Sequence, residues 1–260
     1  TADIDLVRLK NERRRMTTCQ PGTEADGYDY MDFTLERTDL TLNRYIDPAP
    51  FVPSDEQERT ARCEEILTIQ AMGLKKRLAH TGAKSAVVGI SGGLDSTLAL
   101  LVTARAFDML GIPRENILSV TMPCFGTTDR TYNNAVTLTK KLGATLKEVN
   151  IRKAVSIHFE DIGHDPAIHD VTYENGQELA LGWATYNGDH MSMYGVNASV
   201  PKTLVRHLVS YYADTCGDKA LADVLYDVLD TPVSPELLPP EDGKISQKTE
   251  DLVGPYELHD

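Results

Sequence analysis

The chain has 260 residues, a formal net charge of −13 from 39 acidic and 26 basic residues, and a hydrophobic content of 41% that suits a soluble protein with a sizeable core. The acidic balance disfavours a nucleic-acid-binding surface, and no apolar run is long enough to cross a membrane. Four widely spaced cysteines without a secretory leader favour free thiols in a cytoplasmic protein over a zinc site or disulfides; these are Cys19, Cys63, Cys124 and Cys216.

The first 53 residues predict one short helix followed by a long arm. Asp3–Met16 has a helical composition with a basic second half. Residues 17–53 contain Gly, Pro and several aromatic residues but no sustained period. We expect this arm to pack on a neighbouring domain or subunit, or on its own domain, and the first alternative hints at a homo-oligomer.

Residues 54–81 predict a helix. Ser54 as the N-cap and Gln57 three residues later resemble a capping box. Apolar residues follow at near-helical spacing: Ile66, Ile69 and Leu78.

The chain is organised around a strand, a glycine-rich turn and a second helix. Ala86–Ile90 reads as a buried strand, Ser91–Ser96 as the turn, and the helix that follows ends at Gly111. One face of this helix carries Leu98, Leu101, Val102 and Phe107. Gly92 and Gly93 would let backbone N–H groups converge on a phosphate at the positive end of the helix.

The residues after this turn decide which phosphate chemistry it suits. No Gly-Lys-Ser/Thr follows, so the turn is not the loop used for γ-phosphoryl transfer. Asp95 points into the site instead, and a carboxylate beside phosphates is tolerable when Mg²⁺ lies between them. The alternative is an ordinary tight turn between a strand and a helix.

The alternation of strands and helices then continues. Asn116–Met122 predicts a strand, Thr128–Leu142 a helix stopped by Gly143, and Thr145–Ile151 a third strand. Such alternation indicates a parallel sheet covered on both faces, with the ligand at the carboxyl ends of the strands. We therefore expect Met122–Thr127 beside the phosphate loop and against the nucleotide base.

The C-terminal half is less regular. Residues 162–177 show no period, and histidines and aspartates near them match no compact metal-ligand spacing, so local turn hydrogen bonds are the favoured interpretation. These residues are His158, Asp161, His164, Asp165, His169 and Asp170. Residues 178–200 resemble in composition a loop that stacks an aromatic ring, although Trp183 could belong to the core. Pro201–Ala213 predicts a helix that carries the cations Lys202 and Arg206, and residues 230–240 are rich in proline.

The motif SGGLDS at Ser91–Ser96 resembles the signature of the N-type ATP pyrophosphatases, which cleave ATP between the α- and β-phosphates. Longer segments resemble the synthetase domain of glutamine-dependent NAD synthetases: MPCFGTTDRTYNNA (122–135), HFEDIGHDP (158–166), VTYEN (171–175), ELALGWATYNGDHMSMYGVNASVPKTLVR (178–206), TPVSPELLPP (231–240) and QKTEDLVGPYELHD (247–260). The resemblance covers about Asp55 to Asp260.

This resemblance implies a fold, a domain division and a reaction. The fold would be a doubly wound parallel sheet of the adenine nucleotide alpha hydrolase-like type. Residues 1–53 would be the tail of a glutaminase domain with a linker, and residues 54–260 the synthetase domain. The nicotinate carboxylate of deamido-NAD would attack ATP, pyrophosphate would leave, and ammonia would displace AMP to give NAD.

The resemblance also implies roles for individual residues. The residues that would bind ATP are Gly89, Ile90, Ser91, Gly92, Gly93, Leu94, Asp95, Ser96, Lys202 and Ser234. Asp95 and Glu178 would bind Mg²⁺, and Asp95, Glu178 and Lys202 would be the catalytic groups. The residues that would hold deamido-NAD are Asn175, Glu178, Trp183, Ala184, Thr185 and Tyr186.

Three departures from the family pattern make an impaired fragment a second hypothesis. We expect this chain to lack the glutaminase domain, and the family's C-terminal lysine would lie beyond Asp260. Between Gln177 and Glu178 the family has enough further residues for a helix and a parallel strand. We expect a sheet with a gap or a rearranged strand order. A nucleotide-binding module without activity, and another N-type ATP pyrophosphatase such as GMP synthetase, remain alternatives.

Overall fold

A computed structural model describes residues 4–18, 29–34, 36, 41, 45–124, 127–163, 194–231 and 254–256. The chain divides into two units, Thr1–Tyr45 and Ile46–Asp260. In the first unit, α1 spans Leu6–Arg15, and the side chain of Asp5 caps it by accepting the Arg8 N–H at 2.9 Å. The short N-terminal helix is therefore confirmed, and all of its side chains are exposed.

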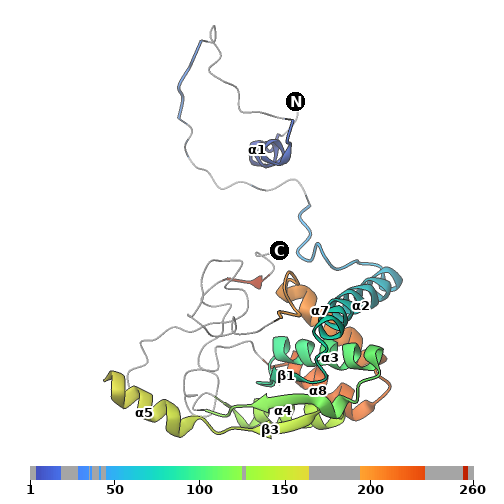
Figure 1. The fold of residues 1–260 in the computed structure, drawn as a ribbon. Helices are drawn as coiled ribbons and strands as arrows, with labels where there is room; N and C mark the ends of the chain where they lie inside the picture. The colour runs from blue at the N-terminus through green and yellow to red at the C-terminus, as the bar shows by residue number, and fades with distance from the viewer. Residues whose placement is uncertain are drawn as a thin grey trace. The chain divides into compact units, whose positions relative to one another are not determined.

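The second unit alternates helices and strands (Figure 1). In chain order the described elements are α2 (Glu56–Thr81), β1 (Ala86–Gly89), α3 (Leu94–Leu110), the 3₁₀ turn η1 (Arg114–Asn116), β2 (Ile117–Thr121), α4 (Asp129–Lys141), β3 (Thr145–Glu148), α5 (Arg152–Ile162), α7 (Lys202–Thr215) and α8 (Lys219–Leu229). The three strands and the helices between them are confirmed, and α5 and α8 are additional elements that the sequence analysis did not predict.

The start of α2 corrects one prediction. The N-cap is Asp55 rather than Ser54, and its carboxylate accepts the N–H of Glu58 at 2.9 Å. Both residue types cap helices well, so sequence pattern alone placed the boundary one residue too early.

The strands form a parallel sheet in the order β1-β2-β3. Val88 pairs with Ser119, and Ser119 with Leu146. The crossovers α3 and α4 both connect neighbouring strands in the same direction, so the right-handed rule puts them on one face of the sheet. On the opposite face Val87 is 70% exposed. Among the described residues, then, β1 forms an edge of the sheet and helices cover one face.

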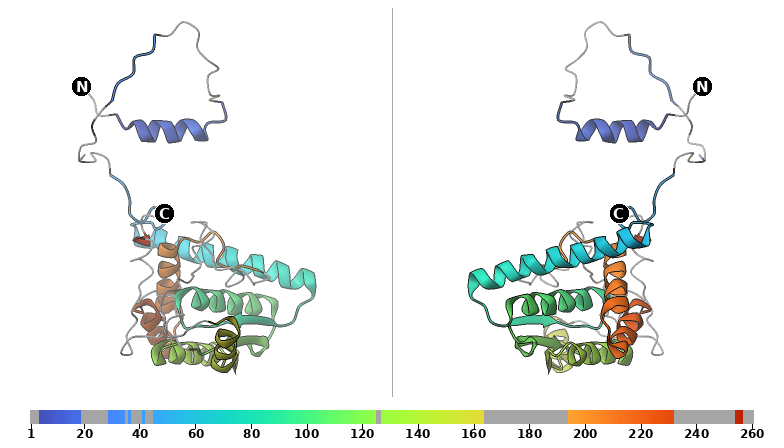
Figure 2. Two further views of the ribbon diagram at one scale, coloured as in Figure 1. Left: turned by 90° about the vertical axis from the view of Figure 1, so that its left-hand side faces the viewer. Right: turned by 90° about the vertical axis from the view of Figure 1, so that its right-hand side faces the viewer.

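The core lies between the covered face of the sheet and the helices α2, α3, α4, α7 and α8 (Figure 2). The predicted inner face of α3 is confirmed, since Leu98 and Phe107 are completely buried. On α2 the prediction holds for buried Leu78 and for Ile66, which packs against the core, but not for Ile69, which is 63% exposed. The buried stripe also runs through Leu67, Ala71 and Leu74. α3 is thus a central helix, and its first turn is held rigidly at the carboxyl end of β1.

Two further features of the described part bear on the expectations above. None of the helices described is long and apolar enough to cross a membrane. Cys63, Cys124 and Cys216 are free thiols, as expected, whereas Cys19 lies outside the described residues.

Candidate functional site

The loop between β1 and α3 has the geometry of an anion cradle. Gly92 has a φ of +87°, a left-handed conformation that glycine adopts without strain. The Ser91 hydroxyl accepts the N–H of Gly93 at 3.2 Å, and the Ser96 hydroxyl donates to the Gly93 carbonyl at 3.1 Å. These two serines hold the loop closed on itself, so the predicted segment Gly89–Ser96 forms one ordered turn.

The helix behind the loop begins without a side-chain cap. Gly93 is the N-cap of α3 and offers no side chain to the N–H groups of the first turn. The first N–H groups of a helix have no partner within the helix, and they carry the positive end of its dipole. An anion placed at this turn would accept hydrogen bonds from them.

A second helix supports the loop from one side. The first turn of α4 packs directly against Gly92, because a methyl group at Gly92 would collide with the carbonyl oxygen of Thr131 and lie 2.8 Å from its carbonyl carbon. Thr128 caps α4, and its hydroxyl accepts the N–H of Thr131 at 3.2 Å. Thr131 was not predicted from the sequence. Thr131 is 2% exposed. The available signal was its position at the start of α4, which follows β2 at the edge of the sheet where the ligand was expected.

Two of the predicted catalytic residues meet in the structure. The ammonium group of Lys202, at the start of α7, contacts the carboxylate Oδ2 of Asp95 in the first turn of α3. The Lys202 side chain is 4% exposed and that of Asp95 is 42% exposed, so the cation lies beneath the carboxylate. The pair combines a buried cation with a solvent-facing carboxylate oxygen beside the phosphate loop.

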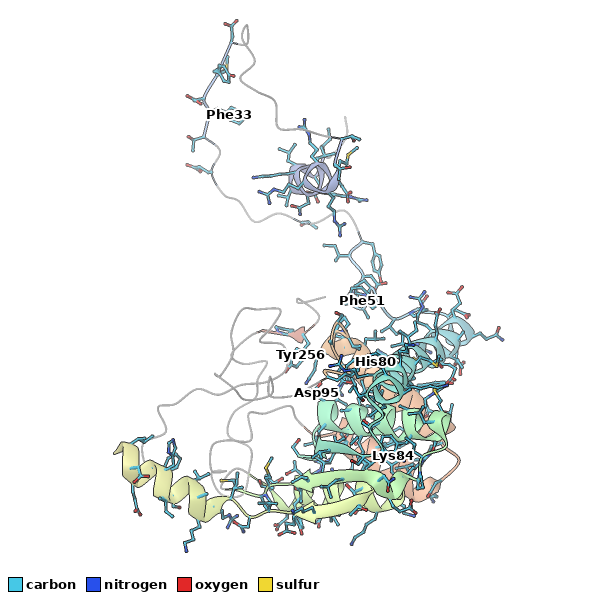
Figure 3. The ribbon with its side chains drawn as sticks, viewed as in Figure 1. Phe33, Phe51, His80, Lys84, Asp95 and Tyr256 are labelled. Carbon is cyan, nitrogen blue, oxygen red and sulfur yellow. The ribbon has the colours of Figure 1, made fainter. Side chains whose placement is uncertain are left out.

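An aromatic ring completes the surroundings of Lys202. The ring centroid of Tyr256 lies 6.0 Å from Lys202 Nζ, within cation–π range, and Tyr256 is 5% exposed. Figure 3 labels Asp95 and Tyr256, which both contact this lysine. Tyr256 was not predicted from the sequence, since nothing in the neighbouring sequence marks it as the partner of a lysine.

The backbone of Asp95 is also fixed. Asn197 donates from Nδ2 to the Asp95 carbonyl at 2.9 Å, and buried Gln70 of α2 donates to the adjacent Val196 carbonyl at 2.8 Å. The turn before α7 therefore connects α2 to the first turn of α3. Asn197 was missed as an individual residue, although it belongs to the segment 178–200 that was predicted to bind.

Several predicted site residues lie outside the described residues. These are Asn175, Glu178, Trp183, Ala184, Thr185, Tyr186 and Ser234. Of the histidines and aspartates considered as a metal cluster, only His158 and Asp161 are described, and both belong to α5. Met122–Thr127 is described except for residues 125 and 126, and its predicted contact with the base stays a prediction.

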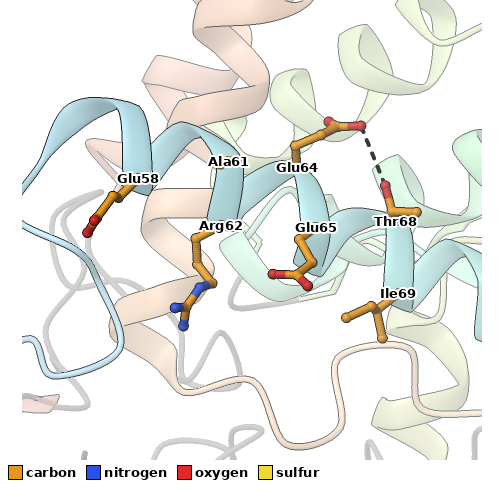
Figure 4. Close-up of a pocket in the computed structure, with 7 residues that line it drawn as sticks. All are labelled: Glu58, Ala61, Arg62, Glu64, Glu65, Thr68 and Ile69. Atoms are coloured by element: carbon orange, nitrogen blue, oxygen red, sulfur yellow. Dashed lines mark hydrogen bonds between the residues drawn. The ribbon is translucent and has the colours of Figure 1, made fainter.

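A hollow of about 850 Å³ lies elsewhere, along α2 (Figure 4). The described residues that line it all belong to α2: Glu58, Ala61, Arg62, Glu64, Glu65, Thr68 and Ile69. Three carboxylates against one guanidinium make it a poor environment for phosphates. We therefore assign the candidate nucleotide site to the loop and not to this hollow.

Comparison with known proteins gives a family match that includes the loop. Residues 66–177 match the family model of NAD synthase. Glutamine-dependent NAD(+) synthetases of Mycobacterium leprae and Mycobacterium bovis are 39% and 38% identical to the whole of this chain. The chain spans 44% of the length of each of these relatives.

Solved structures show a related fold. The glutamine-dependent NAD+ synthetase of Acinetobacter baumannii in complex with ADP matches 66% of this chain and 37% of its own, with a TM-score of 0.55 and 19% identity. The NMN synthetase of Francisella tularensis matches 76% of this chain and 84% of its own, with a TM-score of 0.54 and 17% identity. The fold is therefore the α/β parallel-sheet fold of adenine nucleotide alpha hydrolase-like proteins.

Proposed function

The chain belongs to the NAD synthase family, and on this premise we propose that it carries the synthetase part of a glutamine-dependent NAD synthetase, which amidates deamido-NAD to NAD with ATP. The observation that supports this most directly is the convergence of an uncapped helix N-terminus, a glycine loop, Asp95 and buried Lys202 at one point. That combination suits a polyphosphate and its counter-ion.

The reaction needs an activated acyl group. A carboxylate oxygen of the nicotinate ring attacks the α-phosphorus of ATP, the bond to the β-phosphate oxygen breaks, and pyrophosphate leaves. Ammonia then attacks the acyl carbon and loses one proton to solvent, and AMP departs with the electron pair of the carbon–oxygen bond. No protein nucleophile is required, so the task of the protein is to position the substrates and stabilise charge.

The loop residues supply that stabilisation in our proposal. Backbone N–H groups at Gly92–Ser96 would hold the departing pyrophosphate, where negative charge develops. Lys202 is too buried to be a solvated surface lysine. Its ammonium group would move from Asp95 to a phosphate oxygen without leaving its pocket, and the Tyr256 ring would keep it oriented.

Asp95 is the residue described here that fits a Mg²⁺ ion. Its carboxylate is partly exposed at the phosphate loop, and oxygen is the ligand type that Mg²⁺ prefers. The ion would neutralise charge on the phosphates. Glu178, by the family resemblance, would be the second protein ligand, and Asn175, Trp183–Tyr186 and Ser234 would complete the substrate contacts as the resemblance implies.

The organisation of the chain is part of the proposal. Residues 1–53 would be the end of a glutaminase domain with a linker and residues 54–260 the synthetase domain, working in a homo-oligomer with ammonia from glutamine. The alignment with the Mycobacterium leprae relative runs over 298 residues, whereas this chain has 260. The relative thus contains residues without a counterpart here, which supports an internal gap such as the one proposed between Gln177 and Glu178.

Pyrophosphate release tests the proposal. The polypeptide is incubated with ATP, Mg²⁺ and ammonium, with and without deamido-NAD. We expect pyrophosphate release to depend on deamido-NAD. The Asp95→Ala variant should lower the rate of release at least 100-fold, which corresponds to about 3 kcal/mol of lost transition-state stabilisation. Asp108→Ala, at the other end of α3, is the matched control and should retain activity.

Two other outcomes would overturn the proposal. Release that does not depend on deamido-NAD would point to another N-type ATP pyrophosphatase such as GMP synthetase. A folded protein that binds ATP but releases no pyrophosphate would be a nucleotide-binding module.

A further inference from the structure

One carboxylate on α8 accepts hydrogen bonds from two side chains of α4. Asp227 accepts hydrogen bonds from Arg130 Nε at 2.9 Å and 3.1 Å, and from Asn134 Nδ2 at 2.7 Å. Arg130 also donates from a terminal nitrogen to the Asp227 carbonyl at 3.0 Å. Arg130 holds the pKa of the Asp227 carboxyl below its usual range, with Asn134 adding to the effect, so the group is ionised near neutral pH.

In the sequence, the two residues that bind Asp227 lie before and after Thr131, the residue of α4 that contacts Gly92. Arg130 and Asn134 are four residues apart and share one face of α4. Thr131, between them, turns its backbone toward Gly92, where no room exists for a methyl group. Asn134 is 7% exposed and Thr131 is 2% exposed, so both residues are buried near the start of α4.

We propose that Asp227 is a positioning residue for the phosphate loop: by clamping Arg130 and Asn134 it presses the first turn of α4 against Gly92 and keeps the loop shaped for ATP. The inference rests on the proposed function, because it takes the loop to bind ATP. Asp227 itself would not touch the nucleotide. It acts through the α4 backbone, and no sequence motif or family resemblance pointed to it.

The exposure of the ion pair limits the size of the effect. The Arg130 and Asp227 side chains are 44% and 41% exposed, so the ion pair alone is partly screened by solvent. The Asp227 carboxylate matters because it fixes two donors one helical turn apart, Arg130 and the buried amide of Asn134. Loss of the clamp should therefore loosen the loop rather than unfold the protein.

The test compares ATP binding by the whole chain, measured calorimetrically with Mg²⁺ present and deamido-NAD absent. Asp227→Ala should weaken ATP binding about fivefold, and Asn134→Ala, which removes only one of the bonds, about twofold. The matched control is Asp108→Ala. Asp108 forms a similar pair with Arg114 (2.6 Å and 2.8 Å), far along α3 from the loop.

Hydrogen exchange supplies a readout that a general loss of stability would not reproduce. The N–H groups of Gly92 and Gly93 should exchange faster in Asp227→Ala and Asn134→Ala, and at the wild-type rate in Asp108→Ala. In an active preparation, the KM for ATP should rise while the KM for deamido-NAD and the kcat stay within about twofold.

The outcomes separate the clamp from the proposed function. If the wild type binds ATP and Asp227→Ala binds it equally well, the clamp is refuted and the proposed function stands. If the wild type does not bind ATP, both are refuted. Should Asp227→Ala fail to fold, Asn134→Ala decides, and unchanged ATP affinity together with unchanged loop exchange would overturn the inference.

Discussion

Lys202 on α7 contacts the carboxylate of Asp95 on α3, although 107 residues separate them in the sequence. The two ends of this ion pair differ in burial, because the lysine side chain is 4% exposed and the aspartate 42%. A buried ammonium group needs a partner, whereas a half-exposed carboxylate can be hydrated. The pair is therefore asymmetric in what each partner loses when the other is removed.

This asymmetry predicts the stability of two single variants. Asp95→Ala leaves a buried cation unpaired and should lower the free energy of unfolding by about 1–3 kcal/mol. Lys202→Met removes the cation and keeps apolar volume, so the loss should stay below about 1 kcal/mol. Urea unfolding measures both.

The double variant Asp95→Ala/Lys202→Met provides the control. It should be more stable than Asp95→Ala alone, because it contains no unpaired cation, and it should still lack pyrophosphate release. A Lys202→Met variant that loses as much stability as Asp95→Ala would contradict the proposed asymmetry.

The close approach of α4 to Gly92 predicts that a side chain at position 92 would distort the loop. In Gly92→Ala the methyl group would be strained by the positive φ and would collide with Thr131. The free energy of unfolding should fall by about 2–4 kcal/mol, and ATP binding should be lost. Gly143→Ala is the matched control: its φ of +75° is similar, but nothing lies within 4 Å of a methyl group there. The control should lose only about 1 kcal/mol. Equal losses in urea unfolding would show that the α4 contact does not constrain the loop.

The strand, loop and helix around Gly92 could be predicted from sequence because each depends on local pattern. A β-branched apolar run, two glycines and a 3.6-residue period specify these elements without reference to the rest of the chain. The place of Asp95 in the turn also suggested a phosphate site, whereas Lys202 was assigned to ATP only through the family resemblance. Their direct contact could not be predicted, since it depends on how α7 packs against α3.

The missed residues are those whose role is purely tertiary. Asp227 is one acidic residue among many in an acidic chain, and only the packing of α8 on α4 places it beside Arg130 and Asn134. The signal for α8 itself was present, since Asp218 caps it and Leu221 and Leu225 share its buried face. Ile69 was misplaced for a related reason, because the side of α2 that faces α3 sets which residues are buried.

The contact between the Tyr256 ring and Lys202 predicts that the ring stabilises the buried ammonium group. Because the ammonium group is buried, the cation–π contact should be worth about 1 kcal/mol, and Tyr256→Leu should lose at least that amount, since it also removes buried ring contacts. Tyr256→Phe keeps the ring and should lose clearly less. Tyr226→Leu, on α8 and 42% exposed, controls for the loss of a tyrosine elsewhere. If Phe and Leu at position 256 have equal effects in urea unfolding, the ring contact with Lys202 is not the determinant.

His207 on α7 predicts how stability changes with pH. Burial lowers the pKa of His207 below its ordinary value of 6.5, and the charges of Arg59 and Arg206 lower it further. The unfolded state therefore binds more protons than the folded state once the pH falls below about 6.5. The stability contributed by neutral His207 is fully present above that pH and is lost as the pH falls through the folded pKa.

The measurement is the difference in free energy of unfolding between the wild type and His207→Gln at pH 8 and pH 5.5. Glutamine does not titrate, so the variant should gain on the wild type as the pH falls. Carboxylates such as Glu64, whose pKa Arg105 lowers below 4.5, lose their contribution only at more acidic pH and do so in both proteins. A difference that stays constant between pH 8 and pH 5.5 would mean that His207 binds protons equally in the folded and unfolded states, and that the packing of α7 does not exclude the charged imidazole.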